Sequence, residues 1–257
     1  KQWLKNILVF AGLIFAKKIG DPHSILLSVA GFAAFCVVSS ALYFINDIID
    51  REKDALHPVK AKRPLAAGKL KPAPVSAVAL FLLIIAGFTA YTINLQFFYI
   101  LFFYFIMTIL YSLILKNIVI LDVIIIAVGF VIRAVAGTYI LEVEMSQWLL
   151  LCSFMLAMLI ALGKRRNELI SLGDNANNHR RNLKEYSIQM LDYFIIIIAG
   201  CSIMSYSLYC ISERTEKFFH TVNLKYTNPI VVFGILRYIY VLFLKNIGGE
   251  PETLLYK

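Results

Sequence analysis

The sequence lacks the charge that a soluble protein of its length would carry. Only 16% of its 257 residues are Asp, Glu, Lys or Arg, whereas 60% are hydrophobic. The mean hydropathy is +0.76. A soluble domain shows more charge and clearer amphipathic patterning. The shortage of charge therefore excludes an ordinary soluble fold.

Cysteine is also scarce. The four cysteines, Cys36, Cys152, Cys201 and Cys210, all lie in apolar runs. Their spacing matches no metal site and indicates no disulfide framework, so we interpret them as small hydrophobic core residues. The sequence shows no cleavable signal peptide, since its first apolar run begins almost at residue 1. Because that residue is not Met, we expect an N-terminal tail before it.

Apolar runs long enough to cross a bilayer recur along the whole chain. These runs are continuous and lack the period-2 alternation of a membrane barrel, so they predict helices. The predicted fold class is an all-α polytopic membrane protein. The first of eight expected spans is short, and we expect it to extend in both directions. The expected spans are Asn6–Ala16, Ile25–Ile45, Val75–Ile93, Phe97–Leu115, Val119–Ile140, Gln147–Leu162, Ile188–Ile211 and Pro229–Leu244.

Basic residues are concentrated in two polar loops, residues 46–72 and 163–187. With eight spans, these loops share a face with both chain ends, and that face holds eighteen Lys and Arg against five on the other. This asymmetry predicts that the first face is cytoplasmic. It accounts for most of the net charge of +9, so nucleic acid is not needed as a partner. Anionic lipids and phosphorylated substrates would be attracted.

An acidic motif directly follows the second expected span, in the sequence Asn46-Asp47-Ile48-Ile49-Asp50-Arg51-Glu52-Lys53-Asp54. If the helix continues, Asp47, Asp50 and Asp54 project from one face, and Asn46 joins them. Three crowded carboxylates repel one another unless a cation intervenes. Oxygen ligands without His or Cys favour Mg²⁺ or Mn²⁺, and Mg²⁺ is usually held together with substrate phosphates.

A second interpretation of the acidic motif is a solvated helix end, with its acids paired to Arg51 and Lys53. Asp47 weighs against this interpretation, because it lies at the membrane boundary directly after an apolar span. A carboxylate at that depth is costly unless it has a function. We therefore favour a site for a divalent metal and a diphosphate.

The loop continues with His57-Pro58 and then Arg63-Pro64-Leu65-Ala66-Ala67-Gly68. Together with the acidic motif, this pattern resembles the UbiA-type intramembrane prenyltransferase superfamily. The resemblance implies one domain over residues 1–257, a bundle of about eight to nine transmembrane helices with a cytoplasmic cap over a polar pocket. It places the ninth helix beyond residue 257. It also implies that Asp47, Asp50 and Asp54 bind Mg²⁺, that Asp47 and Asp50 are catalytic, and that Arg63 contacts phosphate.

The second loop indicates the branch of the superfamily. Members that use a prenyl diphosphate donor typically carry a second D-x-x-x-D motif there, but this chain has Gly163-Lys164-Arg165-Arg166-Asn167-Glu168-Leu169. That segment, with the later Arg180 and Tyr186, resembles the decaprenyl-phosphate phosphoribosyltransferase branch. The opening Lys1–Asn6 and the middle segments Tyr111–Lys116, Leu121–Val123 and Gly129–Ala134 also resemble it.

This resemblance implies Mg²⁺-dependent transfer of 5-phosphoribose from phosphoribosyl diphosphate to a polyprenyl phosphate, for cell-envelope arabinan synthesis. It implies a bacterial cytoplasmic membrane protein with its active site facing the cytoplasm; the sequence is also compatible with a homo-oligomer. The residues implied to bind the substrates are Gln2, Lys5, Asn46, Arg63, Tyr111, Lys116, Arg133, Lys164, Arg165, Glu168, Arg180 and Tyr186.

Alternatives remain open for several of these residues. Arg133 lies within an apolar span, and it either meets a phosphate or pairs with Asp122 or a backbone carbonyl. Glu168 is spaced to pair with Lys164 or Arg165, yet two cations would still exceed this one acid. At the level of function, the alternatives are an aromatic prenyltransferase that uses a polyprenyl diphosphate, for a quinone or haem precursor, and a transporter with intramembrane charges.

Overall fold

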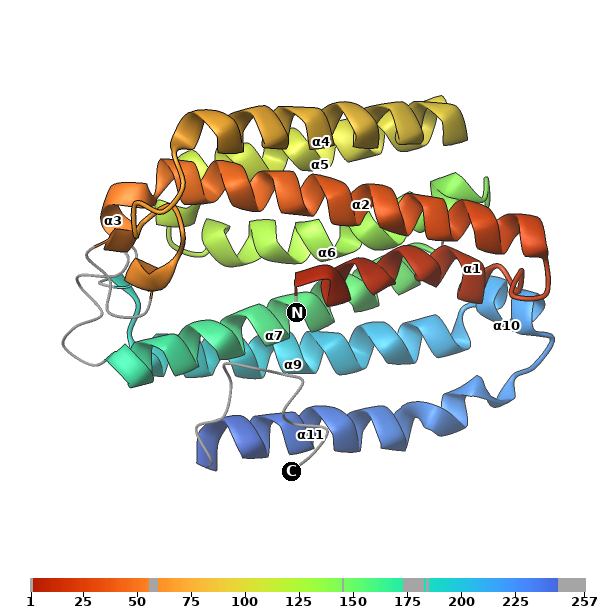
Figure 1. Cartoon of the computed structure of the whole chain (residues 1–257). Helices are drawn as coiled ribbons and strands as arrows, with labels where there is room; N and C mark the ends of the chain where they lie inside the picture. The colour runs from red at the N-terminus through yellow and green to blue at the C-terminus, as the bar shows by residue number, and fades with distance from the viewer. Residues whose placement is uncertain (1, 56–59, 145, 173–182, 184, 245–257) are drawn as a thin grey trace. The chain divides into compact units, whose positions relative to one another are not determined.

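The structure is a computed structural model that describes residues 2–55, 60–144, 146–172, 183 and 185–244 (Figure 1). Its regular elements in these residues are all helices, and seven of them are long and apolar enough to cross a membrane. The predicted all-α polytopic fold is confirmed. The seven helices are α2 (Pro22–Ile49), α4 (Pro72–Ile93), α5 (Leu95–Leu113), α6 (Leu121–Ile140), α7 (Gln147–Leu172), α9 (Ile188–Ile211) and α11 (Asn228–Leu244), the last preceded by η6 (Asn223–Thr227).

The first expected span differs from the prediction. It consists of η1 (Gln2–Phe10) and α1 (Ala11–Phe15), and it is shorter than the seven spanning helices. The predicted extension beyond Ala16 is wrong, because the backbone turns at Lys17, which has a positive φ of 55°. Such a left-handed residue ends a helix. The described residues therefore contain seven candidate spans where we expected eight.

The predicted loop 163–187 is wrong over its first ten residues, since α7 continues to Leu172. The segment after Gly163 is rich in Lys, Arg, Glu and Leu, which favour helix, and the next glycine comes only at position 173. The loop 46–72 also contains helix. Helix α2 runs to Ile49, and α3 (Arg51–Ala55) and η2 (Lys60–Lys62) follow.

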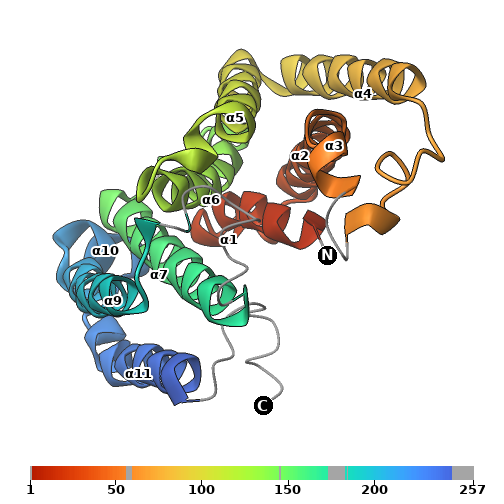
Figure 2. The same cartoon turned by 90° about the vertical axis from the view of Figure 1, so that its left-hand side faces the viewer.

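Helix contacts divide the chain into two compact units, which are described separately. The first comprises Lys1–Ile114 and Ile132–Glu144, and the second Leu115–Val131 and Met145–Lys257. In the first unit, α2 packs beside α4 and against η1 (Figure 2). Phe35 of α2 is fully buried there, with ring centroids 6.0 Å from Phe97 and 5.3 Å from Tyr104. Helix α2 is therefore the centre of this unit.

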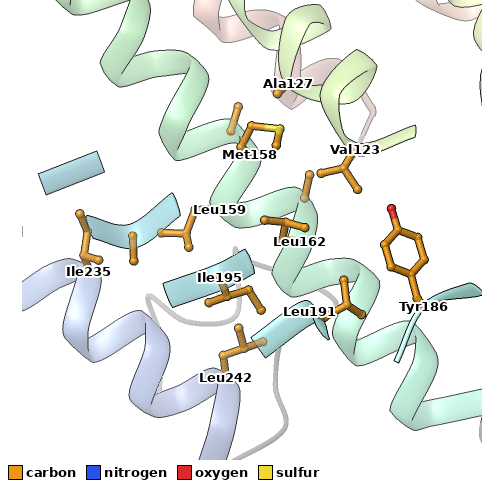
Figure 3. Packing of buried hydrophobic residues seen from close by; sticks show 13 residues of the cluster. Val123, Ala127, Met158, Leu159, Leu162, Tyr186, Leu191, Ile195, Ile235 and Leu242 are labelled. Atoms are coloured by element: carbon orange, nitrogen blue, oxygen red, sulfur yellow. The ribbon is translucent and has the colours of Figure 1, made fainter. Parts of the chain in front are cut away.

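In the second unit, α9 packs against both α7 and α11 (Figures 1 and 2). Side chains from all three helices form one buried cluster, in which Leu159, Ile195 and Leu242 lie close together (Figure 3). Leu191 and Tyr186 extend this cluster toward the N-terminal end of α6. In a bilayer such cores are held by close packing, since lipid is as apolar as the side chains.

Two glycines allow the short α1 to approach α6 within the first unit. A Cβ added at Gly137 would collide with the backbone carbonyl oxygen of Val9, and one added at Gly12 with that of Gly137. Backbones come this close only where side chains are absent. The contact therefore fixes the N-terminal helices against α6.

We predict that Gly137→Ala lowers stability by about 1–3 kcal/mol, because the added methyl forces these backbones apart. The matched control is Gly200→Ala in α9, where an added Cβ meets nothing within 4 Å. That control should be neutral or slightly stabilising. Thermal unfolding of both variants in detergent micelles checks the prediction, and equal midpoints would contradict it.

Candidate functional site

The acidic motif lies at the C-terminal end of α2 and in α3, within the first unit. Asp50 is the residue at which α2 ends, and its carbonyl oxygen accepts a hydrogen bond from the Asp54 N–H at 2.8 Å. The helical path therefore continues almost without a break from Asn46 to Asp54. Asp54 is buried, whereas Asn46, Asp47 and Asp50 are partly exposed.

Arg63 returns from the following loop to the acidic motif. Its Nη1 donates to Asp47 Oδ1 at 2.7 Å and to Asp54 Oδ2 at 2.8 Å. A second contact secures the loop, because Arg51 Nε donates to the carbonyl of the buried Leu65 at 3.2 Å. We name Asp47, Asp54 and Arg63 the acidic cluster. Because Asp47 and Asp54 contact the same nitrogen of Arg63, they lie on a common face of the helical segment, as predicted.

The acidic cluster has two oxygens suited to a hard cation. In the part of the chain that the structure describes, no group of three or more His, Cys, Asp and Glu is arranged to hold a metal ion. However, the carboxylates of Asp47 and Asp54 both contact one guanidinium nitrogen, so they already converge on a single positive centre. The Arg63 guanidinium is therefore the cation that lies between these two carboxylates. Coordination by all three aspartates stays a prediction.

A buried polar group lies around Arg133 in the same unit. Arg133 Nε donates to Asn6 Oδ1 at 2.9 Å, and its Nη2 donates to the Tyr104 hydroxyl at 2.6 Å. Asn6 in turn donates to Ser39 Oγ at 3.3 Å and contacts the Cys36 sulfur at 3.4 Å. The group joins η1, α2, α5 and α6. Contact between Arg133 and a phosphate stays a prediction.

The proposed pairing of Arg133 with Asp122 is wrong. Eleven residues of the continuous helix α6 separate the two, which is about 16 Å along its axis. Asp122 instead forms an ion pair with Arg165, with Oδ2 and Nη2 2.8 Å apart. Their side chains are 0% and 5% exposed. The partners of these two arginines therefore come from different parts of the chain.

Arg165 lies at the centre of a charged group in the second unit. Besides Asp122 it contacts Glu168, with Nη1 and Oε2 2.5 Å apart, so the internal pairing considered for this segment is present. The Tyr186 hydroxyl donates to Asp122 Oδ1 at 2.8 Å. We name Asp122, Arg165, Glu168 and Tyr186 the Arg165 cluster. Burial raises the pKa of the Tyr186 hydroxyl above its ordinary value, so it stays protonated.

Arg166 is also held by an acid from another helix. Its Nε donates to Asp192 Oδ1 of α9 at 2.6 Å, and its Nη1 donates to the Leu242 carbonyl of α11 at 3.2 Å. The guanidinium carbon also lies 4.7 Å from the centre of the Phe243 ring. Arg166 therefore joins α7, α9 and α11. The positive surplus predicted for residues 164–166 ignored Asp122 and Asp192, and these acids neutralise both arginines.

The remaining predicted substrate residues lie on separate elements. The described ones are Gln2 and the exposed Lys5 on η1, the partly buried Tyr111 on α5, the partly buried Lys116 on η3 (Leu115–Asn117) and the exposed Lys164 on α7. Arg180 and His57 fall outside the described residues.

Comparison with known proteins identifies the fold. A profile described as the UbiA prenyltransferase family matches residues 6–244. The chain belongs to this family. A solved structure titled a UbiA homolog from Archaeoglobus fulgidus bound to GPP and Mg²⁺ aligns with a TM-score of 0.75 at 17% identity, covering 100% of this chain and 93% of that one. This likeness supports the UbiA fold alone.

Two curated relatives, both named decaprenyl-phosphate phosphoribosyltransferase, confirm the predicted resemblance within the UbiA family. The protein from Mycolicibacterium smegmatis is 29% identical over 268 residues, covering 100% of this chain and 84% of the relative. The protein from Corynebacterium glutamicum is 32% identical over 216 residues, covering 81% and 64%. The predictions that the chain is a UbiA-family member and a transferase are confirmed.

Sequence reasoning missed three residues that hold the polar groups of this UbiA-type fold together. Asn6 and Tyr104 contact Arg133, and Asp192 contacts Arg166. Tyr104 and Asp192 are polar side chains inside apolar runs, and Asn6 begins one, which signals a buried partner in a membrane protein. That signal predicts that a partner exists, but not which residue it is.

We predict that Asp122→Asn lowers the free energy of unfolding by about 3–5 kcal/mol, because it leaves the Arg165 charge buried with a weaker partner. The matched control is Glu168→Gln, which removes the other acid of Arg165. The Glu168 side chain is 29% exposed, so this loss should cost only about 1 kcal/mol. Thermal unfolding in detergent measures both, and a larger loss for Glu168→Gln would contradict the assignment.

Proposed function

We propose that this UbiA-family chain transfers 5-phosphoribose from phosphoribosyl diphosphate to a polyprenyl phosphate. The products are polyprenyl-phosphoryl-5-phosphoribose and diphosphate. Similarity over the full chain to the decaprenyl-phosphate phosphoribosyltransferase of M. smegmatis is the observation that carries the proposal. The presence of a basic helical segment in place of a second D-x-x-x-D motif supports it.

Mg²⁺ or Mn²⁺ would be held by Asp47, Asp50 and Asp54, with Asn46 beside them. Two of these carboxylates converge on one Arg63 nitrogen, which supports a cation at this place. The oxygen-only donor set also suits a hard metal that shares its ligands with phosphates. When bound, the metal would neutralise charge that develops on the leaving diphosphate.

The residues of the chain would bind and orient three anions. In the reaction, an oxygen of the acceptor phosphate forms a bond to ribose C1, while the bond from C1 to diphosphate breaks and its electrons leave with diphosphate. The attacking oxygen is already anionic, so a strong general base is not required. Arg63, Lys116, Arg133 and Lys164 supply cations for the phosphates, and Gln2, Lys5, Tyr111 and Arg180 are further candidates.

The membrane setting fits a lipid acceptor. Four spanning helices, α4 to α7, separate the loop after α3 from the loop after α7 along the chain, so both loops would face the same side. The excess of Lys and Arg supports the cytoplasmic side of a bacterial membrane. We propose that these loops cap one UbiA-type domain, which supplies a precursor for cell-envelope arabinan.

The direct test incubates purified protein with labelled phosphoribosyl diphosphate, decaprenyl phosphate and Mg²⁺. Label should pass into a lipid whose mass corresponds to the acceptor plus 5-phosphoribose. A parallel reaction supplies a polyprenyl diphosphate with an aromatic acid. Prenylation of the aromatic without labelled lipid would show that the chain is an aromatic prenyltransferase instead.

We predict that Asp47→Asn and Asp54→Asn each reduce transfer at least about a hundredfold, because each removes a charged ligand from the metal. Glu52→Gln is the matched control: Glu52 is exposed and also lies in α3. It should retain activity within about twofold. Full activity in either aspartate variant would exclude the metal assignment.

We predict that Arg63→Gln lowers the thermal midpoint of the metal-free protein, because Asp47 and Asp54 then face each other without a cation. Mg²⁺ should therefore raise the midpoint more in the variant than in the unaltered protein. The thermal midpoint of each protein in buffer that contains a chelator and no added metal serves as the baseline. Equal Mg²⁺-dependent shifts in the two proteins would contradict the proposal that Arg63 and Mg²⁺ neutralise the same two carboxylates.

A further inference from the structure

The hydroxyl of Tyr186 connects two segments that are distant in sequence. It accepts a hydrogen bond from the Ile120 backbone N–H at 2.6 Å and donates to Asp122 Oδ1 at 2.8 Å. Tyr186 is 5% exposed, and its ring lies at the edge of the buried cluster near Val123 (Figure 3). A tyrosine hydroxyl has a single proton, and this one is already donated to Asp122. The hydroxyl therefore has no proton left to donate to a substrate phosphate.

The segment that Tyr186 holds is the turn of residues 115–120, which comprises η3 and the residues that lead into α6. Ile120 has a φ of 70° in this turn. A β-branched residue in the left-handed region is strained and persists only where its surroundings hold it. The Tyr186 hydroxyl contacts the N–H of this strained residue, so it opposes relaxation of the turn.

Tyr186 is itself fixed from both sides. Ser187, the next residue, is the N-cap of α9, and its Oγ accepts a hydrogen bond from the Met190 N–H at 3.1 Å. On the other side, Asp122 is held by Arg165 of α7 through the 2.8 Å ion pair. The turn of residues 115–120 is therefore tied to α7 and to the start of α9.

We infer that Tyr186 is a positioning residue, whose hydroxyl holds the turn of residues 115–120 and thereby fixes the backbone that carries Lys116. The inference rests on the proposed function, in which Lys116 binds phosphate. It reassigns three residues of the Arg165 cluster that the resemblance implied to bind substrate. Arg165 contacts Glu168 and Asp122, and Tyr186 contacts Asp122. These side chains therefore support the turn that carries Lys116.

The test is a double-mutant cycle on transfer activity. Tyr186→Phe removes only the hydroxyl and should reduce kcat/KM about five- to twentyfold, the effect of losing one or two hydrogen bonds. Lys116→Gln should reduce it by at least as much. In the Lys116→Gln background, Tyr186→Phe should change kcat/KM less than about twofold, because the residue it positions is gone. Tyr193→Phe, which removes an exposed hydroxyl on α9, is the matched control and should be neutral.

Amide hydrogen exchange gives a readout that needs no substrate. Peptides covering residues 115–122 should exchange faster in Tyr186→Phe than in the unaltered protein, and Tyr193→Phe should leave them unchanged. If Tyr186→Phe does not accumulate, it is made in the Ile120→Gly background, where glycine adopts the positive φ without strain. Exchange of residues 115–122 in that double variant should be faster than in Ile120→Gly alone, because the backbone N–H at position 120 has lost its acceptor.

Three results would overturn the inference. The first is that the reductions in kcat/KM caused by Tyr186→Phe and Lys116→Gln multiply in the double variant. The second is that either single variant leaves kcat/KM unchanged. The third is that Tyr186→Phe leaves the exchange of residues 115–122 unchanged. Failure of the proposed function is a separate outcome, because the unaltered protein would then form no labelled lipid while the exchange experiment still reports on the turn.

Discussion

A charge buried in a membrane protein must meet a partner, because hydrocarbon offers it no water. The buried and half-buried arginines of this chain meet that constraint with partners from other segments. Arg63 reaches Asp47 and Asp54, Arg165 reaches Asp122, and Arg166 reaches Asp192. These pairs connect loops to helices and helices to one another. The ion pairs that neutralise these buried charges therefore also fix the positions of the paired side chains.

This constraint separates two kinds of basic residue. Arg165 and Arg166 are almost fully buried and are paired with carboxylates. They therefore attach the C-terminal part of α7 to α6 and α9. Arg63 is 39% exposed and contacts both Asp47 and Asp54, whose carboxylate oxygens are also suitable ligands for a divalent metal. Under the proposed function, this contact would be exchanged for a metal and a phosphate. The acidic cluster is thus suited to binding, and the Arg165 cluster is suited to support.

Much of the fold follows from the sequence, because the apolarity needed to cross a bilayer is a local property. The bounds of α9 match the prediction, and those of α4 and α11 nearly do. The end of α1 does not, since it depends on a turn at Lys17. The end of α7 does not either, since the predicted loop begins within a charged segment that favours helix. At the site, helical spacing predicts that Asp47 and Asp54 share a face. Spacing cannot predict that Asp122 and Asp192 neutralise the basic segment, because those acids lie in other spans.

The central claim is that the face of Asp47, Asp50 and Asp54 holds the diphosphate of a phosphoribosyl donor through a divalent metal. The most direct measurement is an experimental structure of the protein with phosphoribosyl diphosphate and Mg²⁺. We predict that the carboxylates hold Mg²⁺ together with the donor's diphosphate, with Arg63 moved from the acids to the phosphate. Diphosphate bound elsewhere, with Arg63 still between Asp47 and Asp54, would contradict it.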